Sequence, residues 1–283
     1  MNLLTYDLDL GGGSLLQSAN RSSEQMMSYI IDCPEGGTIV IDGGTYCEGD
    51  ANHLYKELEK RGKKVDYWFF THCHHDHYGA WLKLIEDGRF DITVSHLCFH
   101  FPPKEWLFEK EDPLSTKKFF AALKQKPFSV TTPRVGDCFS VGGVTVEVLN
   151  EPINYHSYRA INATSLIFKV HFPKRSVLFL GDFDAEAEED YAKHFSVEKL
   201  KCDIVQMAHH GQNGVSRNFY QLIQPKFCLY TAPDWLWENN AYYRNEIASR
   251  GKGSFTIMET RLWMAELGVI RSFHLGDGDW LFR

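Results

Sequence analysis

The feature that most constrains this chain is a run of seven residues, Thr71 to His77, that holds four histidines and one aspartate. The run directly follows an apolar segment, residues 65–70, which has the composition of a buried strand. Imidazole nitrogens bind zinc, iron and similar ions, and a carboxylate adds negative charge, so a cluster of both can hold more than one metal ion. The run therefore predicts a metal site at the end of a strand.

Three other places also put metal-competent groups at the end of an apolar segment. They are Asp42 after residues 38–41, Asp182 after residues 176–180, and the pair His209-His210 after residues 203–208. Sites in α/β proteins are usually assembled from the carboxyl ends of several strands. We therefore expect these side chains to meet the histidine run.

The hydrophobic pattern predicts strands interleaved with helices in both halves of the chain. This order is typical of sheets covered on the outside by helices. The expected helices are 52–61, 79–87, 114–124, 185–195 and a segment around 219–223. The expected strands are 3–10, 38–41, 65–70, 92–99, 144–149, 165–172, 176–180, 203–208, 227–230, 254–258, 269–275 and 280–282.

The spacing of His72, His74, Asp76 and His77 resembles the HxHxDH signature of the metallo-β-lactamase superfamily. The resemblance implies an α/β fold of four layers, αββα, in which two mixed β-sheets are flanked by helices. It extends over nearly the whole chain, and no linker separates two parts, so we expect a single domain over residues 1–283. An aromatic-rich insert around residues 100–128 lies where this fold often varies.

The resemblance also implies a ligand set for two divalent metal ions, with zinc expected and manganese or iron compatible with the same donors. His72 and His74 would bind the first ion, and Asp182 would bridge both ions. The second ion would be held by Asp76, His77 and His209. Without the resemblance, we would interpret Asp182 as an aspartate that forms a turn or caps the helix that follows it.

Two further positions are expected to support the ligands. Asp42 would hold the loop beneath them, although an aspartate before Gly43-Gly44 is also typical of a simple turn. Asn162 stands where the family usually has a histidine, and His156 would need a different register to replace it. The first metal position is therefore expected to have fewer protein ligands than the second.

The pair His209-His210 is ambiguous, since related proteins write this landmark as histidine, one residue, then glycine. That spacing favours His209 as the ligand. His210 is then expected to act in catalysis as a substrate contact or a proton donor to the leaving group. Asp76 is expected to orient the attacking hydroxide as well as to bind metal. Cys73 and His75 would point away from their neighbours in an extended segment.

Within the superfamily, the chain is most similar to the hydrolase domain of competence-type DNA-uptake proteins and to its stand-alone relatives. The segments 162–166, 178–182 and 209–211 carry this similarity. It implies a hydrolase that uses a metal-bound hydroxide on a phosphodiester or similar ester. Hydrolysis of a lactone, thioester or lactam is the alternative within enzymes.

Two readings from other classes stay open. The chain could be a metal-stabilised binding module that has lost turnover, given the asparagine at position 162. It could also be an interaction protein that uses the aromatic insert as a lid or as a contact in a homo-oligomer. The aromatic residues Trp235, Trp237, Tyr242 and Tyr243 could line a substrate pocket, but such groups more often belong to the core.

The composition of the chain limits the kinds of binding partner and the cellular location that we expect. The formal net charge of −7 does not favour nucleic acid, whose binders usually carry a basic face, so a small-molecule or phosphodiester substrate is expected. No segment approaches the roughly eighteen consecutive apolar residues of a membrane span. The seven cysteines lack the spacing of a disulfide framework. We therefore expect a cytoplasmic protein with no membrane segment.

Overall fold

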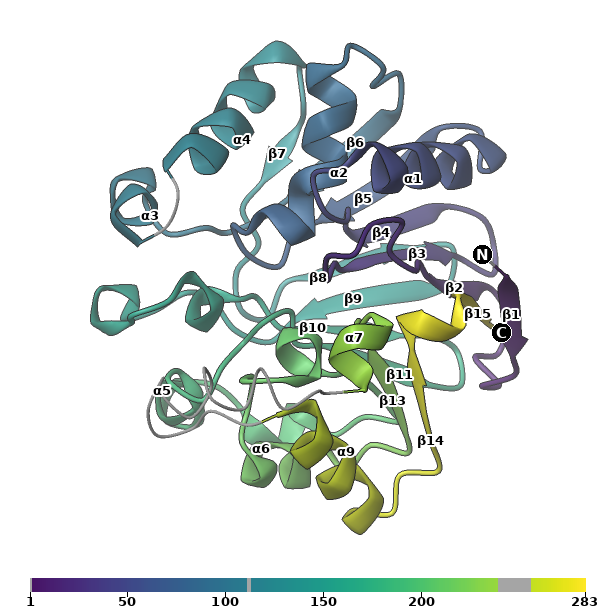
Figure 1. The fold of residues 1–283 in the computed structure, drawn as a ribbon, viewed down its shortest axis with the longest axis vertical. Coiled ribbons are helices and arrows are strands. Elements are labelled where there is room, and N and C mark those ends of the chain that lie inside the picture. Colours follow the sequence, from purple (N-terminus) through teal and green to yellow (C-terminus); the bar gives the residue numbers. More distant parts are fainter. Residues whose placement is uncertain (1, 111–112, 239–255) are drawn as a thin grey trace.

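Two β-sheets stack face to face, with helices on the outer face of each, in the computed structural model, which describes residues 2–110, 113–238 and 256–283 (Figure 1). The helices α1, α2 and α4 lie on the side of the first sheet, and α5, α6 and α9 lie on the side of the second. The α/β four-layer arrangement predicted from the sequence is confirmed.

The first sheet contains eight strands within the described residues and is mixed. The half of the sheet from β4 to the edge strand β7 is parallel, while β3 is antiparallel to both of its neighbours, β2 and β4. In spatial order its strands are β1 (Leu3–Tyr6), β15 (Asp279–Phe282), β2 (Ser14–Gln17), β3 (Ser28–Asp32), β4 (Thr38–Asp42), β5 (Lys64–Phe69), β6 (Thr93–Cys98) and β7 (Val130–Thr131).

The second sheet contains seven strands within the described residues and is also mixed. It is antiparallel from β8 to β11 and parallel from β11 to β14. In spatial order its strands are β14 (Arg271–His274), β13 (Phe227–Tyr230), β12 (Ile204–Gln206), β11 (Ser176–Phe179), β10 (Phe168–His171), β9 (Val144–Val148) and β8 (Cys138–Val141).

The connections between strands carry the helices, several of which are short. The α-helices are α1 (Glu48–Lys60), α2 (His75–Glu86), α3 (Lys104–Lys110), α4 (Pro113–Gln125), α5 (Glu188–His194), α6 (Arg217–Ile223), α7 (Asp234–Trp237) and α9 (Ile257–Glu266). The 3-10 turns are η1 (Tyr155–Ser157), η2 (Ile161–Thr164), η3 (Val197–Leu200), η4 (Ala208–Gly211) and η5 (Leu275–Asp277).

The core between the two sheets follows from the alternation of side chains along each strand. Tyr29 and Phe179, one from each sheet, meet with ring centroids 5.0 Å apart, and so do Phe69 and Phe168. All four side chains are fully buried. Residues 29–31 of β3 and 177–179 of β11 are buried without a break, as in strands covered on both faces, whereas β10 alternates between buried and half-buried positions.

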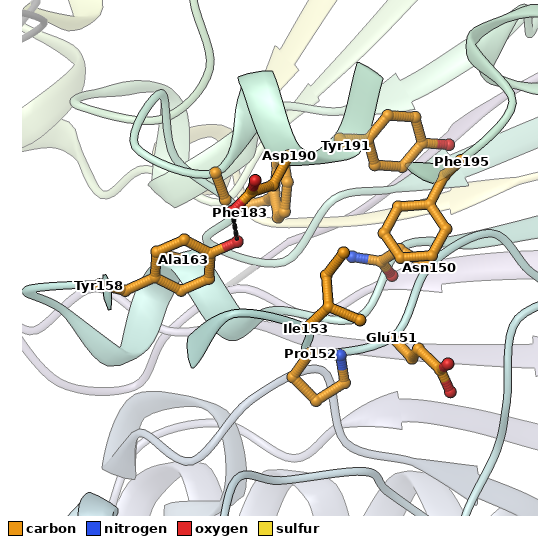
Figure 2. A pocket seen from close by; sticks show the side chains of 11 residues that line it. Asn150, Glu151, Pro152, Ile153, Tyr158, Ala163, Phe183, Asp190, Tyr191 and Phe195 are labelled. Carbon is orange, nitrogen blue, oxygen red and sulfur yellow. Dashed lines mark hydrogen bonds between the residues drawn. The ribbon is translucent and has the colours of Figure 1, made fainter. Parts of the chain in front are cut away.

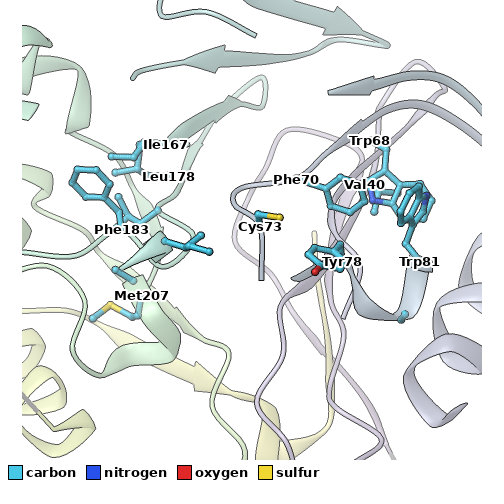
Figure 3. Close-up of a cluster of buried hydrophobic side chains, with 14 of the residues drawn as sticks. Val40, Trp68, Phe70, Cys73, Tyr78, Trp81, Ile167, Leu178, Phe183 and Met207 are labelled. Carbon is cyan, nitrogen blue, oxygen red and sulfur yellow. The ribbon is translucent and has the colours of Figure 1, made fainter. Parts of the chain in front are cut away.

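A second core lies between each sheet and its helices. Figure 3 shows Trp68, Phe70 and Trp81 in this layer on the side of the first sheet, and Leu178 and Met207 on the side of the second. All five side chains are fully buried. The two layers fix the carboxyl ends of β5, β11 and β12, which are the strand ends that precede the expected ligands.

The aromatic insert contributes to this outer core. Phe119 of α4 is fully buried, and its ring contacts those of Phe70, Tyr78 and Trp81 at centroid distances of 4.8 to 5.7 Å. Trp106 of α3 is 6% exposed and packs on Tyr155. The aromatic residues at these positions are therefore explained by burial against α2 and η1.

One expected strand, residues 254–258, is wrong where the structure describes it. Residues 254 and 255 lie outside the described residues, as do Tyr242 and Tyr243 of the second aromatic group. Ile257 and Met258 begin α9, because a capping box starts the helix at Thr256. The Thr256 side chain accepts a hydrogen bond from the Glu259 backbone N–H, and the Glu259 side chain accepts one from the Thr256 backbone N–H.

Among the described residues, no helix is both long and apolar enough to cross a membrane.

Candidate metal centre

The histidine run is divided by the start of a helix. After β5 the chain bends at His72 and Cys73, His74 is the N-cap of α2, and the helix begins at His75. Asp76 and His77 therefore lie in the first turn of α2, where a negative charge is favoured by the helix dipole. The sequence pattern placed this helix start later, at residue 79, since ligands interrupt its hydrophobic periodicity.

Asp42 ties the run to the neighbouring strand β4. Its Oδ1 accepts from the backbone N–H of Thr71 at 2.8 Å, and its Oδ2 accepts from the Thr71 hydroxyl at 2.8 Å. The same Oδ2 lies 2.7 Å from Nδ1 of His77. Burial raises the pKa of Asp42, while His77 and Thr71 act in the opposite direction. The carboxylate thus holds the His77 ring with Nε2 facing away from it.

The second sheet presents Asp182 three residues after Phe179, the fully buried last residue of β11. Gly181 adopts a left-handed conformation, φ +55°, and a Cβ atom there would lie 2.8 Å from the Thr71 side chain. The Gln206 side chain fixes this loop, since it accepts from the N–H groups of Leu180 and Gly181 and donates to the carbonyls of Gly181 and Met207.

The turn η4 carries the two adjacent histidines in an unusual backbone conformation. Both His209 and His210 have left-handed φ values, 51° and 58°. Nδ1 of His210 lies 3.1 Å from the Thr231 carbonyl oxygen, and its ring is fully buried. The His209 ring is 18% exposed and lies beside Asn162. The turn therefore directs the His210 ring toward Thr231 and the His209 ring toward Asn162.

Two groups of donor atoms result, and they share one carboxylate. In each group the donor atoms lie within 4.8 Å of one another. Asp182 belongs to both groups, and its Oδ2 lies 3.8 Å from Nε2 of His72 and 3.5 Å from Nε2 of His210. The first group is His72, His74 and Asp182, and the second is Asp76, His77, Asp182 and His210.

This arrangement differs from the sequence expectation at two adjacent residues, His209 and His210. His210, which was expected to contact substrate, lies with Asp76, its Nε2 being 3.1 Å from the Asp76 Oδ2. His209, which was expected to join Asp76 and His77, lies outside that group and has its Nε2 3.8 Å from Oδ2 of Asp182. The order of two adjacent histidines in a turn depends on backbone torsions, which residue spacing does not reveal.

The remaining predicted positions are also located. Asn162 is 7% exposed on η2, and its amide nitrogen lies 3.2 Å from Nε2 of His209. The Cys73 side chain is buried in the hydrophobic core, and His75 is 56% exposed and faces Glu24. His156 is exposed on η1 and stacks against the neighbouring Tyr155.

The pKa values in the cluster reflect burial and neighbouring charges. Burial lowers the pKa of His72, and the nearby His77 adds to that effect, so the ring stays neutral and able to bind metal. Burial is the largest single effect on His77 and His210 and acts in the same direction, but the neighbouring carboxylates together outweigh it. Asp182, Asp42 and Asp76 raise the pKa of His77, and Asp182 and Asp76 raise the pKa of His210 to about 9. These two histidines in turn keep the pKa values of Asp76 and Asp182 low despite burial.

The donor set fits a divalent cation. Nε2 of His77 and Oδ1 of Asp182 face each other at 3.2 Å, yet neither atom has a hydrogen bond of normal geometry among the described residues. Buried polar atoms without such partners are uncommon in native proteins and call for an explanation such as an ion. Imidazole and carboxylate groups are suitable ligands for zinc, manganese and iron.

Several supporting residues were not predicted from the sequence. Thr71, Gln206 and Thr231 are fully buried, and each is within two residues of the end of β5, β12 or β13. Their polar side chains bind Asp42, the Asp182 loop and His210, respectively. A polar residue at the end of an apolar strand was the available signal, but such residues are also common in turns.

A small pocket, whose lining includes Ala163 and Phe183, is adjacent to the segments that carry Asn162 and Asp182 (Figure 2). Its walls include Ile153, Phe183 and Tyr191, and the Tyr158 hydroxyl at its edge donates to Asp190 at 2.9 Å. None of its lining residues belongs to the two donor groups. The pocket therefore adds no residue to the candidate metal centre.

Comparisons with solved structures agree with this fold at low sequence identity. The metallo-beta-lactamase fold protein YhfI from Bacillus subtilis aligns with a TM-score of 0.55 and 11% identity, over 95% of this chain and 99% of YhfI. CmlA, a diiron β-hydroxylase from Streptomyces venezuelae, aligns with a TM-score of 0.57 and 14% identity over 96% of this chain. The chain spans about half of CmlA, 54% of its length.

Comparisons at the level of sequence identify the family. A search of curated proteins found no match. A family profile described as the metallo-beta-lactamase superfamily matches residues 24–225, which include both donor groups. The chain belongs to the metallo-β-lactamase superfamily.

Proposed function

We propose that this protein is a metal-dependent hydrolase with two divalent metal ions, one at each donor group. The observation that carries this proposal is the pair of buried His/Asp groups that share Asp182. Two cations at such a place would lower the pKa of a water molecule toward neutrality and polarise the bond to be cleaved. No serine or cysteine nucleophile is needed for this chemistry.

The protein side chains would then divide the work. Asp182 would hold the two positions together, while Asp76, which is 7% exposed, would orient the attacking water and accept its proton. His210 would act as a ligand rather than as a substrate contact, because its ring is fully buried and is engaged at Nδ1 by Thr231.

A phosphodiester or a similar ester is the substrate class we favour. It rests on the similarity of segments 162–166, 178–182 and 209–211 to the hydrolase domain of competence-type DNA-uptake proteins and its stand-alone relatives, which remains a prediction. Lactone, thioester and lactam hydrolysis are the alternatives. Zinc is the expected metal, and manganese and iron suit the same donors; CmlA, which shares the fold, is described as a diiron protein.

The test combines metal content with turnover. We expect about two metal ions per chain and hydrolysis of bis-p-nitrophenyl phosphate by the metal-loaded protein. The double variant Asp76→Ala, His77→Ala should lose at least one ion and the turnover. His75→Ala is the matched control, since this histidine lies in the same run but is 56% exposed and outside both groups.

The same experiment separates the alternatives. Turnover of an ester, lactone or thioester panel without hydrolysis of the phosphodiester would move the proposal to those substrates. Two bound ions with no turnover on any substrate would indicate a metal-stabilised binding module. A wild-type protein that binds no metal would contradict the proposed function.

A further inference from the structure

The two donor groups are unequal, and the difference lies at the first one. The second group has four side chains, whereas His72, His74 and Asp182 are the only members of the first within the described residues. Zinc in proteins is bound by four ligands, or by three protein ligands and a water molecule. Manganese and iron usually take more. The first position therefore has room for another protein donor.

Two polar side chains border the first group without belonging to it. Nε2 of His209 lies 3.8 Å from the shared Asp182 carboxylate. Only 7% of Asn162 is exposed, and its Oδ1 has no hydrogen-bond partner among the described residues. The Asn162 amide nitrogen lies 3.2 Å from Nε2 and 3.4 Å from Nδ1 of His209. The amide thus contacts one edge of the imidazole ring and restricts its rotation.

The backbone conformation of η4 separates the side chains of the two histidines. A left-handed conformation costs a non-glycine residue roughly 1–2 kcal/mol, and His209 and His210 adopt it in succession. The turn is held by the His209 N–H, which donates to the Gly181 carbonyl at 3.0 Å, and by the Thr260 hydroxyl, which donates to the Gly211 carbonyl at 2.7 Å. Strain maintained in this way is typical of functional sites.

The consequence of this turn is that the two rings diverge. Their centroids are 6.1 Å apart, with His210 beside Asp76 and His209 beside Asn162. A residue in a right-handed or extended conformation at either position would direct its side chain elsewhere. Both histidines nevertheless border the shared Asp182 carboxylate, with Nε2 of His209 3.8 Å and Nε2 of His210 3.5 Å from its Oδ2.

We propose that the adjacent histidines serve different metal positions: His210 the second, and His209 the first, where it adds the fourth protein donor. Asn162 is the positioning residue that orients the His209 ring, as outer partners of ligand histidines commonly do. This inference rests on the proposed function, because it assumes that both donor groups bind metal.

The test compares the affinities of the two positions by titrating metal-free protein with Co²⁺ in competition with a chelator, using the visible absorption of the bound ion. We expect His209→Ala to weaken one of the two binding steps by at least about 100-fold, and Asn162→Ala to weaken the same step by about 10–100-fold. The other step should keep its wild-type affinity. His75→Ala should match the wild type at both steps.

Thermal unfolding of the metal-free proteins separates a ligand role from a structural one. The variants should melt, without metal, within a few degrees of the wild type. If His209→Ala does not fold, His209→Gln keeps a polar side chain of similar size, lacks the imidazole, and should show the same selective loss.

The outcomes are distinct from those that test the hydrolase proposal. Two Co²⁺ ions bound by His209→Ala or His209→Gln with wild-type affinities would overturn the assignment of His209, while leaving a two-metal enzyme intact. If turnover then fell and its pH profile changed, His209 would be a proton donor. A wild-type protein that binds no Co²⁺ would instead contradict the proposed function itself.

Discussion

Oδ2 of Asp42 lies 2.7 Å from Nδ1 of His77, and both side chains are completely buried. The carboxylate joins β4 to the first turn of α2, and it directs Nε2 of His77 toward Asp182. Carboxylate partners of this kind fix the ring orientation and raise the basicity of ligand histidines. The relationship makes Asp42, which lies outside both donor groups, important for metal binding.

The variant Asp42→Asn tests this relationship. Asparagine tolerates the left-handed backbone found here, φ 59°, so the turn should form. Its amide would, however, place a donor against Thr71 or His77, both of which need an acceptor. We expect metal affinity at the second group to fall by about 10–100-fold, as measured by chelator competition. Unchanged affinity in a folded variant would contradict the predicted role.

Removal of metal should lower the melting temperature. A ligand that binds only the folded state at 100 times its dissociation constant stabilises it by about 2.7 kcal/mol. For a chain of this size that corresponds to a shift of roughly 5–10 °C. Calorimetry of the chelator-treated protein before and after addition of Zn²⁺ would measure it, with the Asp76→Ala, His77→Ala variant expected to show a smaller shift.

The Gln206 side chain should contribute strongly to the stability of the fold. Its amide makes four hydrogen bonds to backbone groups of residues 180, 181 and 207, so Gln206→Leu would leave all four groups without that partner. We expect a loss of at least about 3 kcal/mol in the free energy of unfolding by urea.

The matched control for Gln206 is Gln17→Leu. This glutamine is also fully buried, but within the described residues it makes one hydrogen bond, to the Tyr230 carbonyl, and its Oε1 has no partner. The expected loss is about 1 kcal/mol. Equal losses in the two variants would mean that the Asp182 loop does not depend on the Gln206 amide.

Asp279 predicts a pH-dependent contribution to stability. Its carboxylate lies 2.6 Å from Arg21 and 3.3 Å from His53, and it accepts from the Ala19 N–H. Burial alone would raise the pKa of Asp279, but hydrogen bonds and charge from His53, Ala19 and Arg21 lower it. Its stabilising effect should therefore be complete above the unfolded pKa of about 3.9 and be lost as pH falls through the lower folded value.

The variant Asp279→Asn isolates this effect. We expect it to be less stable than the wild type by on the order of 1–3 kcal/mol between pH 5 and 7. The difference should shrink as the pH falls below about 4, because the Asp279 carboxyl of the unfolded wild-type chain is then protonated before that of the folded chain, whose pKa is lower. Urea unfolding across this range measures it, and a difference that does not change with pH would show that the charge of Asp279 is unimportant.

The sequence by itself indicated the order of strands and helices and, through the resemblance carried by the HxHxDH spacing, the fold class and the candidate ligands. Apolar segments ending in Asp42, Asp182 and the two histidine segments required strands whose carboxyl ends meet, and the HxHxDH spacing indicated the family. These features are local, so periodicity and residue type were sufficient. The capping box at Thr256 was equally local, and reading it would have replaced the expected strand with a helix.

Only the tertiary structure decided which of the two adjacent histidines faces which donors. His209 and His210 have the same side chain and neighbouring positions, and their directions depend on left-handed torsions held by the Gly181 carbonyl and by Thr260. The same is true of Asn162, which meets His209 across 47 positions in the chain. Such contacts join segments around the second sheet that are far apart in the sequence, η2 before β10 and η4 after β12, and no local pattern of residues encodes them.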